Sequence, residues 1–462
     1  MTPEVVITRR SQSFTNPERR FLDPVATARG SDTHMSSQPA PSFIGKGSPE
    51  SDLSPADLRE ILERTLLRIA PGARVLAIIP DKTRDDNTDL LFPIATDILS
   101  TRQVAQFDAL VAQGTHGPMT HAEKLSKVGF GGDASGPFGE IFDHQWDVPA
   151  ELATIGELNA EEVSRLTNGL LNEAVSVNLN RRLAPDIYDT ILIFSATVPH
   201  EVAGFAGGAK YLFPGVAGPD LTHATHWLGA LASIENVIGR IETPTRHMIE
   251  AAADFVSAQL ITLNSVITRD EDNNLRTHAL FTGDFRSAFR AAAEVSKQVH
   301  IKYTGRKYKR VVALLDEHYD ELWVGGKASY KLGGIIEEGG ELIIYAPHLR
   351  SISETHGRLI EKYGYAPLDR VREMVALSTE LQNNLAVAAH LAHVSYAGKR
   401  DPEGRVVPRY RITMASALDQ DTCRRVNLGF MDHRDFRRED YEDDPNTLVV
   451  ERAGRDLYLV EP

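Results

Sequence analysis

The sequence predicts an α/β fold with two α/β domains and mostly parallel sheets, on three observations. Short, buried apolar runs such as those at 75–79 and 191–194 indicate strands, and they alternate with amphipathic helical segments. Such alternation favours a largely parallel sheet with helices on both faces. The length of 462 residues exceeds what one hydrophobic core usually holds, so at least two domains are expected.

The first half of the chain shows this alternation most clearly. Ser54 is a good N-cap, Pro55 suits the first helical position, and apolar residues then recur at helical spacing from Leu58 to Ile69. The other elements expected in this half are strands at 75–79, 107–112, 175–179, 191–194 and 260–267, and helices at about 88–101 and 284–297.

The domain organisation follows from shifts in composition. Residues 1–50 read as an N-terminal arm, partly disordered, because apolar periodicity is weak there apart from a short strand at 5–7. Residues 51–300 are expected to form the first domain and residues 301–462 a second α/β domain, with the basic segment 302–310 as a solvated linker. The second domain is predicted to contain strands at 311–315 and 342–345, a long helical region at 368–394 and a solvated charged run at 432–444.

The charge and cysteine content exclude several classes of protein. A formal charge of -14 disfavours binding to nucleic acid or to anionic lipid, so neither is an expected partner. Cys423 is the one cysteine, which excludes an intrachain disulfide and any cysteine-based zinc or iron–sulfur site within the chain. No apolar run approaches the roughly 18 residues of a membrane span and no signal sequence is evident, so a cytoplasmic location is expected.

Three predicted buried strands run directly into polar residues. Arg84 follows the strand at 75–79, His116 follows the strand at 107–112, and His200 follows the strand at 191–194. Ligands bind at the carboxyl ends of the strands in open parallel sheets. Arginine binds carboxylates with a planar fork, and histidine moves protons near neutral pH. Each residue alone is more typical of a structural turn, but together they predict an acid–base site for a carboxylate.

A glycine-rich segment follows His200. Gly204, Gly207 and Gly208 let the backbone come close to a ligand, and Lys210 ends the segment. It is not a nucleotide-hydrolysing P-loop, because Ala209 stands where that motif needs its second glycine and a tyrosine replaces its Ser/Thr. The alternative is a plain glycine-rich turn with a surface lysine.

A pair of histidines lies beyond this segment. Asp220 is expected to cap a helix that carries His223 and His226. Their spacing of three places both on one helix face, as metal ligands often are, although satisfied surface histidines are more common.

Taken together, these residues resemble the nickel-dependent lactate racemase family. The matching motifs lie at 81–84, 114–120, 198–210, 213–215, His226 and 321–327. The likeness runs from about residue 70 to residue 350 and weakens towards the end. It implies that residues 51–300 form a catalytic and cofactor-binding domain, and that residues 301–462 close over an active site in the cleft between the two domains.

The resemblance also implies a nickel-pincer nucleotide, which is pyridinium-3,5-bisthiocarboxylic acid mononucleotide carrying nickel. Lys210 matches the lysine that forms a thioamide with one cofactor arm, and His226 matches the nickel ligand. Sulfur and imidazole suit nickel, and the cofactor brings the sulfur that this chain lacks. The other residues expected to contact the cofactor are Asp81, Gly207, Gly208 and Trp323.

The reaction implied is racemisation or 2-epimerisation of a small 2-hydroxy acid by reversible hydride transfer. His116 and His200 match the two acid–base residues, Arg84 matches the carboxylate-binding residue, and Lys327 matches a lysine that helps to hold substrate. The further partners implied are the enzymes that build the cofactor and insert nickel, which bind transiently.

The chain departs from the family where the substrate is expected. Trp323 and Val324 stand where Tyr-Gln is expected, and the run at 346–353 introduces His348, Arg350 and Ser353. These three side chains suit hydroxyls or a second carboxylate, unless they face solvent. A 2-hydroxy acid larger and more polar than lactate, such as a sugar acid, is therefore expected.

Two other functions stay open on sequence alone. One is a divalent-metal (zinc) hydrolase or lyase that uses His116, His200 and His226 directly. The other is a non-catalytic homologue that binds nickel or a hydroxy acid.

Overall fold

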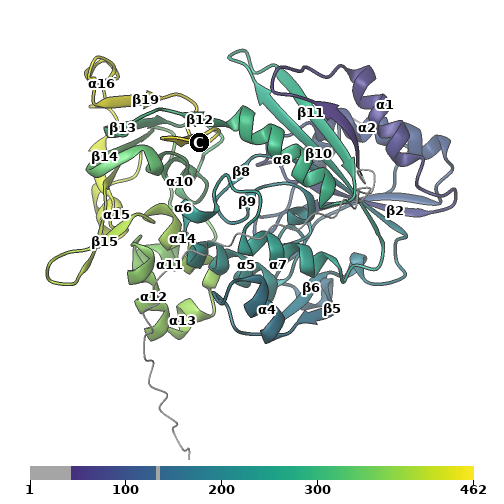
Figure 1. Cartoon of the computed structure of the whole chain (residues 1–462), viewed down its shortest axis with the longest axis horizontal. Helices are drawn as coiled ribbons and strands as arrows, with labels where there is room; N and C mark the ends of the chain where they lie inside the picture. The colour runs from purple at the N-terminus through teal and green to yellow at the C-terminus, as the bar shows by residue number, and fades with distance from the viewer. Residues whose placement is uncertain (1–42, 132–135) are drawn as a thin grey trace, which may run out of the picture. The chain divides into compact units, whose positions relative to one another are not determined.

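The computed structural model describes residues 43–131 and 136–462. Two α/β lobes are built around two sheets, one of seven strands and one of five (Figure 1). We call them the first lobe and the second lobe. The mostly parallel strands of both sheets confirm the predicted α/β fold class.

The first lobe is centred on a sheet with the order β1-β11-β10-β7-β2-β3-β4. The run from β10 to β4 is parallel, and β11 and β1 add two antiparallel strands at one edge. The strands are β1 (Phe43–Gly47), β2 (Arg74–Pro80), β3 (Gln106–Ala112), β4 (Ile141–Phe142), β7 (Thr190–Ala196), β10 (Gln259–Arg269) and β11 (Leu275–Gly283). Two small antiparallel pairs accompany it, β5 (Leu152–Leu158) with β6 (Val175–Asn180) and β8 (Pro199–His200) with β9 (Gly204–Phe205).

Helices cover both faces of this sheet. Alternate residues of β2 face opposite sides: Val75 and Ile79 join the core under α1 and α2, whereas Leu76 and Ile78 join the core under α5 and α7. The helices are α1 (Pro55–Leu66), α2 (Thr88–Thr101), α3 (His121–Lys127), α4 (Ala160–Leu166), α5 (Pro219–Ala232), α6 (Ile234–Val237), α7 (Pro244–Ala253) and α8 (Ser287–His300), with 3-10 turns at Pro149–Glu151, Arg181–Leu183 and Gly208–Tyr211. The predicted start of the first helix is confirmed, because Ser54 and Asp57 form a capping box.

The second lobe holds an entirely parallel sheet with the order β18-β17-β14-β13-β19. Its strands are β13 (Tyr308–Leu314), β14 (Ile336–Ala346), β17 (Arg411–Ser416), β18 (Gly429–Asp432) and β19 (Thr447–Val450), with the pairs β12 (Ile301–Tyr303)–β20 (Leu457–Leu459) and β15 (Gly398–Arg400)–β16 (Val406–Pro408). Its helices are α9 (Leu322–Gly325), α10 (Lys327–Leu332), α11 (Gly357–Tyr363), α12 (Leu368–Leu377), α13 (Thr379–Gln382), α14 (Leu385–Val394), α15 (Gln420–Arg425) and α16 (Glu439–Glu442), with a 3-10 turn at Gly333–Ile335.

Four segments differ from the expectations. The strand β1 lies inside the segment predicted as an arm, whereas the strand expected at 5–7 is outside the described residues. The region at 368–394 is three helices, α12 to α14, because Ser378 and Asn384 interrupt it as N-caps. Both ends of the basic segment 302–310 are strands, β12 and β13, rather than linker. The charged run at 432–444 is partly packed, since Phe436 stacks on Tyr345 at 4.3 Å between ring centroids.

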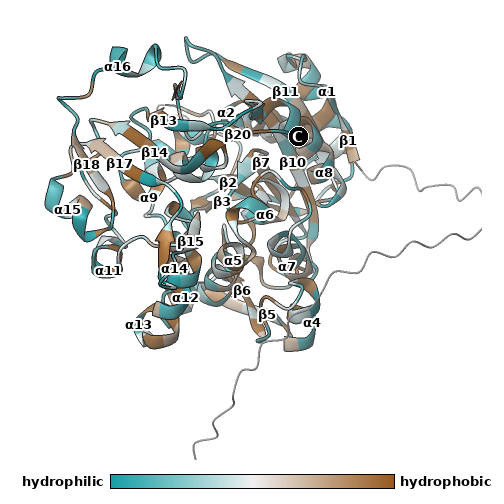
Figure 2. Ribbon diagram, turned by 60° about the vertical axis from the view of Figure 1, so that its left-hand side comes forward, coloured by the Kyte–Doolittle hydropathy of each residue, from teal (hydrophilic) through white to brown (hydrophobic). Residues whose placement is uncertain are grey.

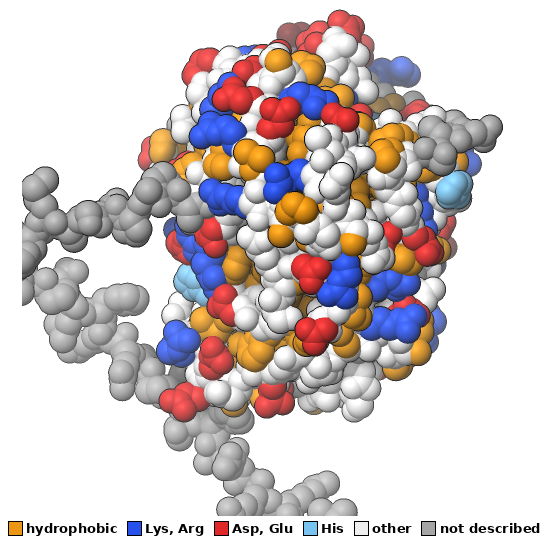
Figure 3. Space-filling model, turned by 90° about the vertical axis from the view of Figure 1, so that its right-hand side faces the viewer, with side chains coloured by type: hydrophobic (Ala, Val, Ile, Leu, Met, Phe, Trp, Pro, Cys, Tyr) orange, Lys and Arg blue, Asp and Glu red, His pale blue; other side chains and the backbone are white. Residues whose placement is uncertain are grey.

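The two lobes share one continuous core. Phe205, Trp227 and Phe289 of the first lobe belong to the same buried cluster as the inner face of the second sheet and the helix α14. In Figure 2 the apolar helix α14 is brown, whereas α15 and α16 on the surface are teal. Acidic and basic side chains are interspersed over the face drawn in Figure 3. In the described part of the chain, no helix is long and apolar enough to cross a bilayer.

Candidate functional site

The carboxyl ends of three adjacent strands bring the predicted site residues together. The strands β7, β2 and β3 are neighbours and run parallel. Arg84 follows β2, His116 follows β3 and His200 follows β7. The structure therefore brings these three residues to one edge of the sheet, as the strand pattern predicted.

The first predicted acid–base residue, His116, is held by a buried carboxylate. Asp81 is 2% exposed, and its Oδ2 lies 2.8 Å from Nδ1 of His116. Its Oδ1 accepts hydrogen bonds from the backbone N–H and the hydroxyl of Thr83, at 2.7 and 2.5 Å. Burial raises the pKa of Asp81, but the contacts with His116 and the charge of Arg84 outweigh burial and hold it below its usual range. The carboxylate is therefore charged, and His116 donates Nδ1–H to it and keeps a lone pair on Nε2.

The second predicted acid–base residue, His200, has a different partner. Nδ1 of His200 accepts a hydrogen bond from the backbone N–H of Val202 at 3.1 Å. A neutral ring must then carry its proton on Nε2. The pKa of His200 is well below its usual value because of burial and of the positive charges of Lys210, Arg84 and Lys327. His116 and His200 thus present opposite forms of Nε2, one able to accept a proton and one carrying a proton.

The glycine-rich segment packs against the protein itself. Gly207 and Gly208 have positive φ angles of 106° and 58°, and a Cβ on Gly207 would lie 2.7 Å from the hydroxyl of Thr197. The N–H of Gly208 donates to Oδ1 of Asn264 at 2.8 Å, so it serves an internal contact. The glycines therefore let the segment lie on the sheet and hold the turn that carries Lys210. Their predicted contact with the cofactor stays a prediction.

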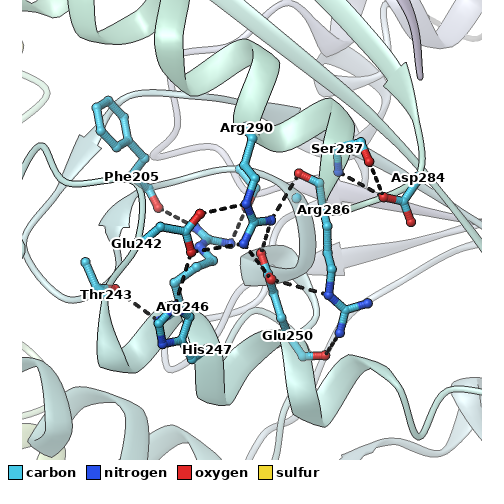
Figure 4. Close-up of polar contacts among 12 residues, drawn as sticks. Phe205, Glu242, Thr243, Arg246, His247, Glu250, Asp284, Arg286, Ser287 and Arg290 are labelled. Carbon is cyan, nitrogen blue, oxygen red and sulfur yellow. Dashed lines mark hydrogen bonds and ion pairs between the residues drawn. The ribbon is translucent and has the colours of Figure 1, made fainter. Parts of the chain in front are cut away.

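A buried arginine supports the other side of this segment. Arg246, on α7, is fully buried and donates to the carbonyls of Phe205 at 2.6 Å and Gly207 at 3.2 Å (Figure 4). Its guanidinium carbon lies 3.8 Å from the ring centroid of Phe289, and its Nε has no hydrogen-bond partner among the described residues. Burial lowers the pKa of Arg246 to about 10. The sequence around it reads as an ordinary surface helix, so sequence reasoning did not identify this residue.

Three cations and one carboxylate are grouped in the site. Burial lowers the pKa of Lys210 to about 7, and the charge of Arg84 adds to this effect while Glu201 opposes it. Burial lowers the pKa of Lys327, the first residue of α10, to about 8, again with Arg84 adding and Glu201 opposing. Lys210 therefore has a substantial neutral fraction near neutral pH, whereas Lys327 stays mostly protonated. Glu201 was missed at the sequence level, although its position next to His200 was a usable signal.

The predicted metal ligand has one free ring nitrogen. Nδ1 of His226 donates to the carbonyl of Thr222 at 2.7 Å, which leaves Nε2 with its lone pair. Burial lowers the pKa of His226 to about 4, so the ring is neutral at neutral pH. Its predicted companion His223 accepts a hydrogen bond from the N–H of Ala386 instead, at 3.3 Å. The expected capping role of Asp220 is wrong: Gly218 is the N-cap of α5, and Asp220 accepts from Asn178.

Residues of the second lobe face this site. Trp323 lies between His356 and His390, with ring centroids 4.5 and 4.1 Å away. Burial lowers the pKa of His356 to about 4, and His116 and His223 of the first lobe add to this effect. His356 is therefore within electrostatic reach of the predicted base His116, and sequence reasoning did not identify it.

The remaining predicted substrate residues lie further out. Nε2 of His348 is hydrogen-bonded to the carbonyl of Tyr319 at 3.1 Å, and Nζ of Lys327 lies 5.8 Å from the ring of Tyr319. His348 and Lys327 therefore both contact Tyr319. Arg350 is exposed.

No group of three or more His, Cys, Asp or Glu side chains in the described ranges is placed to hold a metal ion. A site built from His116, His200 and His226 directly on zinc therefore gains no support from this geometry.

Comparison with known proteins adds the following. Residues 61–239 match the family described as the lactate racemase N-terminal domain. A crystal structure of a protein from Thermotoga maritima is 33% identical in sequence, with a TM-score of 0.80, over 88% of this chain and 98% of that chain. The lactate racemase apoprotein from Thermoanaerobacterium thermosaccharolyticum is 17% identical, with a TM-score of 0.64, over 90% of this chain and 99% of that chain, which shows a shared fold. Among curated proteins, no match was found.

Proposed function

This chain belongs to the lactate racemase family, and on that premise we propose that it is a racemase or 2-epimerase of a 2-hydroxy acid. The observation that carries the proposal is the position of two histidines at the carboxyl ends of parallel strands, beside a group of cations. His116 can accept a proton at Nε2, and Nε2 of His200 carries one. Inversion at C2 changes the position of the substrate hydroxyl relative to the protein. The hydroxyl proton is therefore removed by one group and returned by another, and two acid–base side chains suit this requirement.

We propose that the resident cofactor is the nickel-pincer nucleotide, covalently attached to Lys210 with nickel on Nε2 of His226. The residues fit this group. Metal-binding histidines usually donate their other ring N–H to a carbonyl or carboxylate, as His226 does to Thr222. A lysine with a pKa of about 7 offers a free amine for acylation at neutral pH. When bound, the cofactor would accept and return the C2 hydride of the substrate.

The chain's own residues would bind the substrate carboxylate and transfer the hydroxyl proton. Arg84 and Lys327 would bind the substrate carboxylate, since a cation in a buried site forms strong charge-assisted hydrogen bonds with a carboxylate. His116 would take the hydroxyl proton at Nε2, and Asp81 would stabilise the resulting imidazolium through Nδ1–H. His200, once it is protonated on both ring nitrogens, would return a proton at Nε2 on the opposite side.

The substrate we propose is larger and more polar than lactate, such as a sugar acid. Glu321 and the neutral His356 both interact electrostatically with His116, and this pair would offer acceptors and donors to hydroxyl groups rather than a cation to a second carboxylate. The carboxylate of Glu321 is held in place by the N–H of Glu354 at 2.8 Å. Its negative charge disfavours a dicarboxylic acid in this position.

The partners that we propose are enzymes that build the cofactor and insert nickel, because the chain itself supplies only one cysteine. The experiment uses protein made in cells that contain those enzymes. Nickel content and the mass of the Lys210 peptide are measured first, and a panel of lactate, glycerate, malate and gluconate is then followed by chiral chromatography. Epimerisation of any member by wild type, lost together with the cofactor in Lys210→Ala, supports the proposal. Full activity in Lys210→Ala would contradict it, and cofactor-loaded protein that epimerises nothing would favour a non-catalytic homologue.

A further inference from the structure

His200 cannot act as a base in the arrangement described above. Its Nδ1 accepts the N–H of Val202, so the proton of the neutral ring occupies Nε2, the nitrogen that should receive a proton. Giving up that proton from the neutral ring would leave an imidazolate, which is far too basic to form near neutral pH. A working His200 must therefore carry a proton on Nδ1 and exchange a second proton at Nε2.

The backbone around His200 is too well fixed to solve this problem. Pro199 and His200 pair with Phe205 and Gly204 in the β8–β9 hairpin. The carbonyl of Gly204 accepts from Gly239 at 3.0 Å, and the carbonyl of Phe205 accepts from Arg246. The change must therefore come from side chains.

One carboxylate is within reach of the ring. Oε2 of Glu201 lies 3.5 Å from Nδ1 of His200, and both side chains are mostly buried, at 16% and 12% exposure. In the described ranges, no other carboxylate lies within 4 Å of this ring. A rotation of the Glu201 side chain, together with a rotation of the His200 ring that moves Nδ1 away from the N–H of Val202, would close the distance to a hydrogen bond of about 2.8 Å.

We propose that Glu201 is the carboxylate partner of His200 and accepts its Nδ1–H whenever this histidine exchanges a proton with the substrate, as Asp81 already does for His116. The proposal deepens the racemase or epimerase function and rests on it. In one direction the His200 ring is protonated on both nitrogens and gives its Nε2 proton to the substrate alkoxide. The ring is then neutral, and its Nδ1–H remains hydrogen-bonded to Glu201. In the other direction the same neutral ring takes the hydroxyl proton at Nε2.

The surrounding charges make such a partner necessary. The groups that face His200 are Lys210 on the glycine-rich segment, Arg84 after β2, Lys327 on α10 and His226 on α5, and all oppose a positive imidazolium. The same lysines stabilise the charge of Glu201, whose pKa, although raised by burial, is lowered overall by Lys327 and its other neighbours. Glu201 is thus an ionised carboxylate whose negative charge offsets the unfavourable positive charge of the His200 imidazolium. It is a positioning residue, since it acts through His200.

The test compares Glu201→Gln, Glu201→Asp and the surface control Glu403→Gln, whose carboxylate pairs with Arg405 and is 63% exposed. Cofactor-loaded proteins are assayed with whichever member of the panel above the wild type epimerises, and rates are expressed per loaded site. Glu201→Gln should lower kcat about tenfold or more in both directions while KM changes less than about threefold. Glu201→Asp should keep more activity than Glu201→Gln, and the control should match wild type.

Wild-type kcat in Glu201→Gln, or equal losses in Glu201→Gln and Glu201→Asp, would overturn the inference. ¹⁵N NMR of histidine-labelled wild type, assigned with His200→Gln, adds a measurement that needs no cofactor. The His200 ring should show its proton on Nε2 and His116 on Nδ1, and a proton on Nδ1 of His200 in the resting protein would overturn the argument. A wild type that epimerises no panel member contradicts the proposed function instead.

Discussion

Replacing Arg246 by methionine should destabilise the protein modestly and loosen the turn that carries Lys210. The substitution leaves the carbonyls of Phe205 and Gly207 without their donor, at a cost of about 1–3 kcal/mol each. It also removes the cation–π contact with Phe289, worth about 1–2 kcal/mol. These losses sum to roughly 3–8 kcal/mol.

A gain opposes these losses. The pKa of Arg246 falls from 12.5 to about 10, which corresponds to a burial cost of about 3 kcal/mol for the cation that methionine does not bear. The net loss should therefore lie between about 0 and 5 kcal/mol and centre near 2–3 kcal/mol, measured as the change in the free energy of unfolding in urea. The matched control is Arg405→Met, which removes an exposed ion pair with Asp401 and should cost less than about 0.5 kcal/mol. Unchanged or increased stability in Arg246→Met would refute the reasoning that this arginine holds the glycine-rich segment.

Three further predictions concern the site itself. In protein without cofactor, acylation of Lys210 by a water-soluble anhydride should rise with pH around a midpoint near 7, because burial lowers its pKa to about 7. The exposed Lys362, whose pKa is raised by its hydrogen bond to Glu380, should react only at higher pH, and equal profiles by peptide mass spectrometry would contradict this. Asp81→Asn should lower kcat of the loaded enzyme about 100-fold, because it removes the charge that stabilises protonated His116, and a loss below about threefold would argue against that role. Glu321→Gln should raise kcat/KM for malate relative to gluconate about tenfold, since a negative charge within electrostatic reach of His116 is removed, and an unchanged ratio would contradict the assignment of this wall.

The fold was predictable because its signals are local. The buried strands at 75–79, 107–112 and 191–194 are short apolar runs, and the structure forms them as β2, β3 and β7. Their parallel order then brings Arg84, His116 and His200 together without any further information. The breaks among α12, α13 and α14 were missed because apolar residues continue across them, and only the N-caps at Ser378 and Asn384 mark them.

Residues whose role depends on distant partners were not predictable. Arg246 is buried only because α7 packs beneath the glycine-rich segment, and its sequence neighbours resemble those of an exposed helix. Likewise, Trp323 was expected at the cofactor, and the structure packs it between His356 and His390 from two other helical segments. Whether its edge also meets the cofactor is a prediction that the cofactor-loaded protein would test.

Two similar histidine pairs show why spacing alone does not assign a ligand. His226 on α5 and His393 on α14 each stand three residues after another histidine, and the two helices pack together. The difference lies at the ring nitrogens. His226 donates Nδ1–H to Thr222, which orients its Nε2 lone pair, whereas Nε2 of His393 is buried and has no hydrogen-bond partner in the described part of the chain. An oriented lone pair on a neutral ring is what a metal requires, so the geometry favours His226 as the ligand and leaves His393 as a neutral neighbour of Glu201. His226→Ala should therefore lose nickel, whereas His393→Phe, which keeps the aromatic packing against Tyr330, should retain it in metal analysis of the loaded protein. Loss of nickel in both variants alike would refute this distinction.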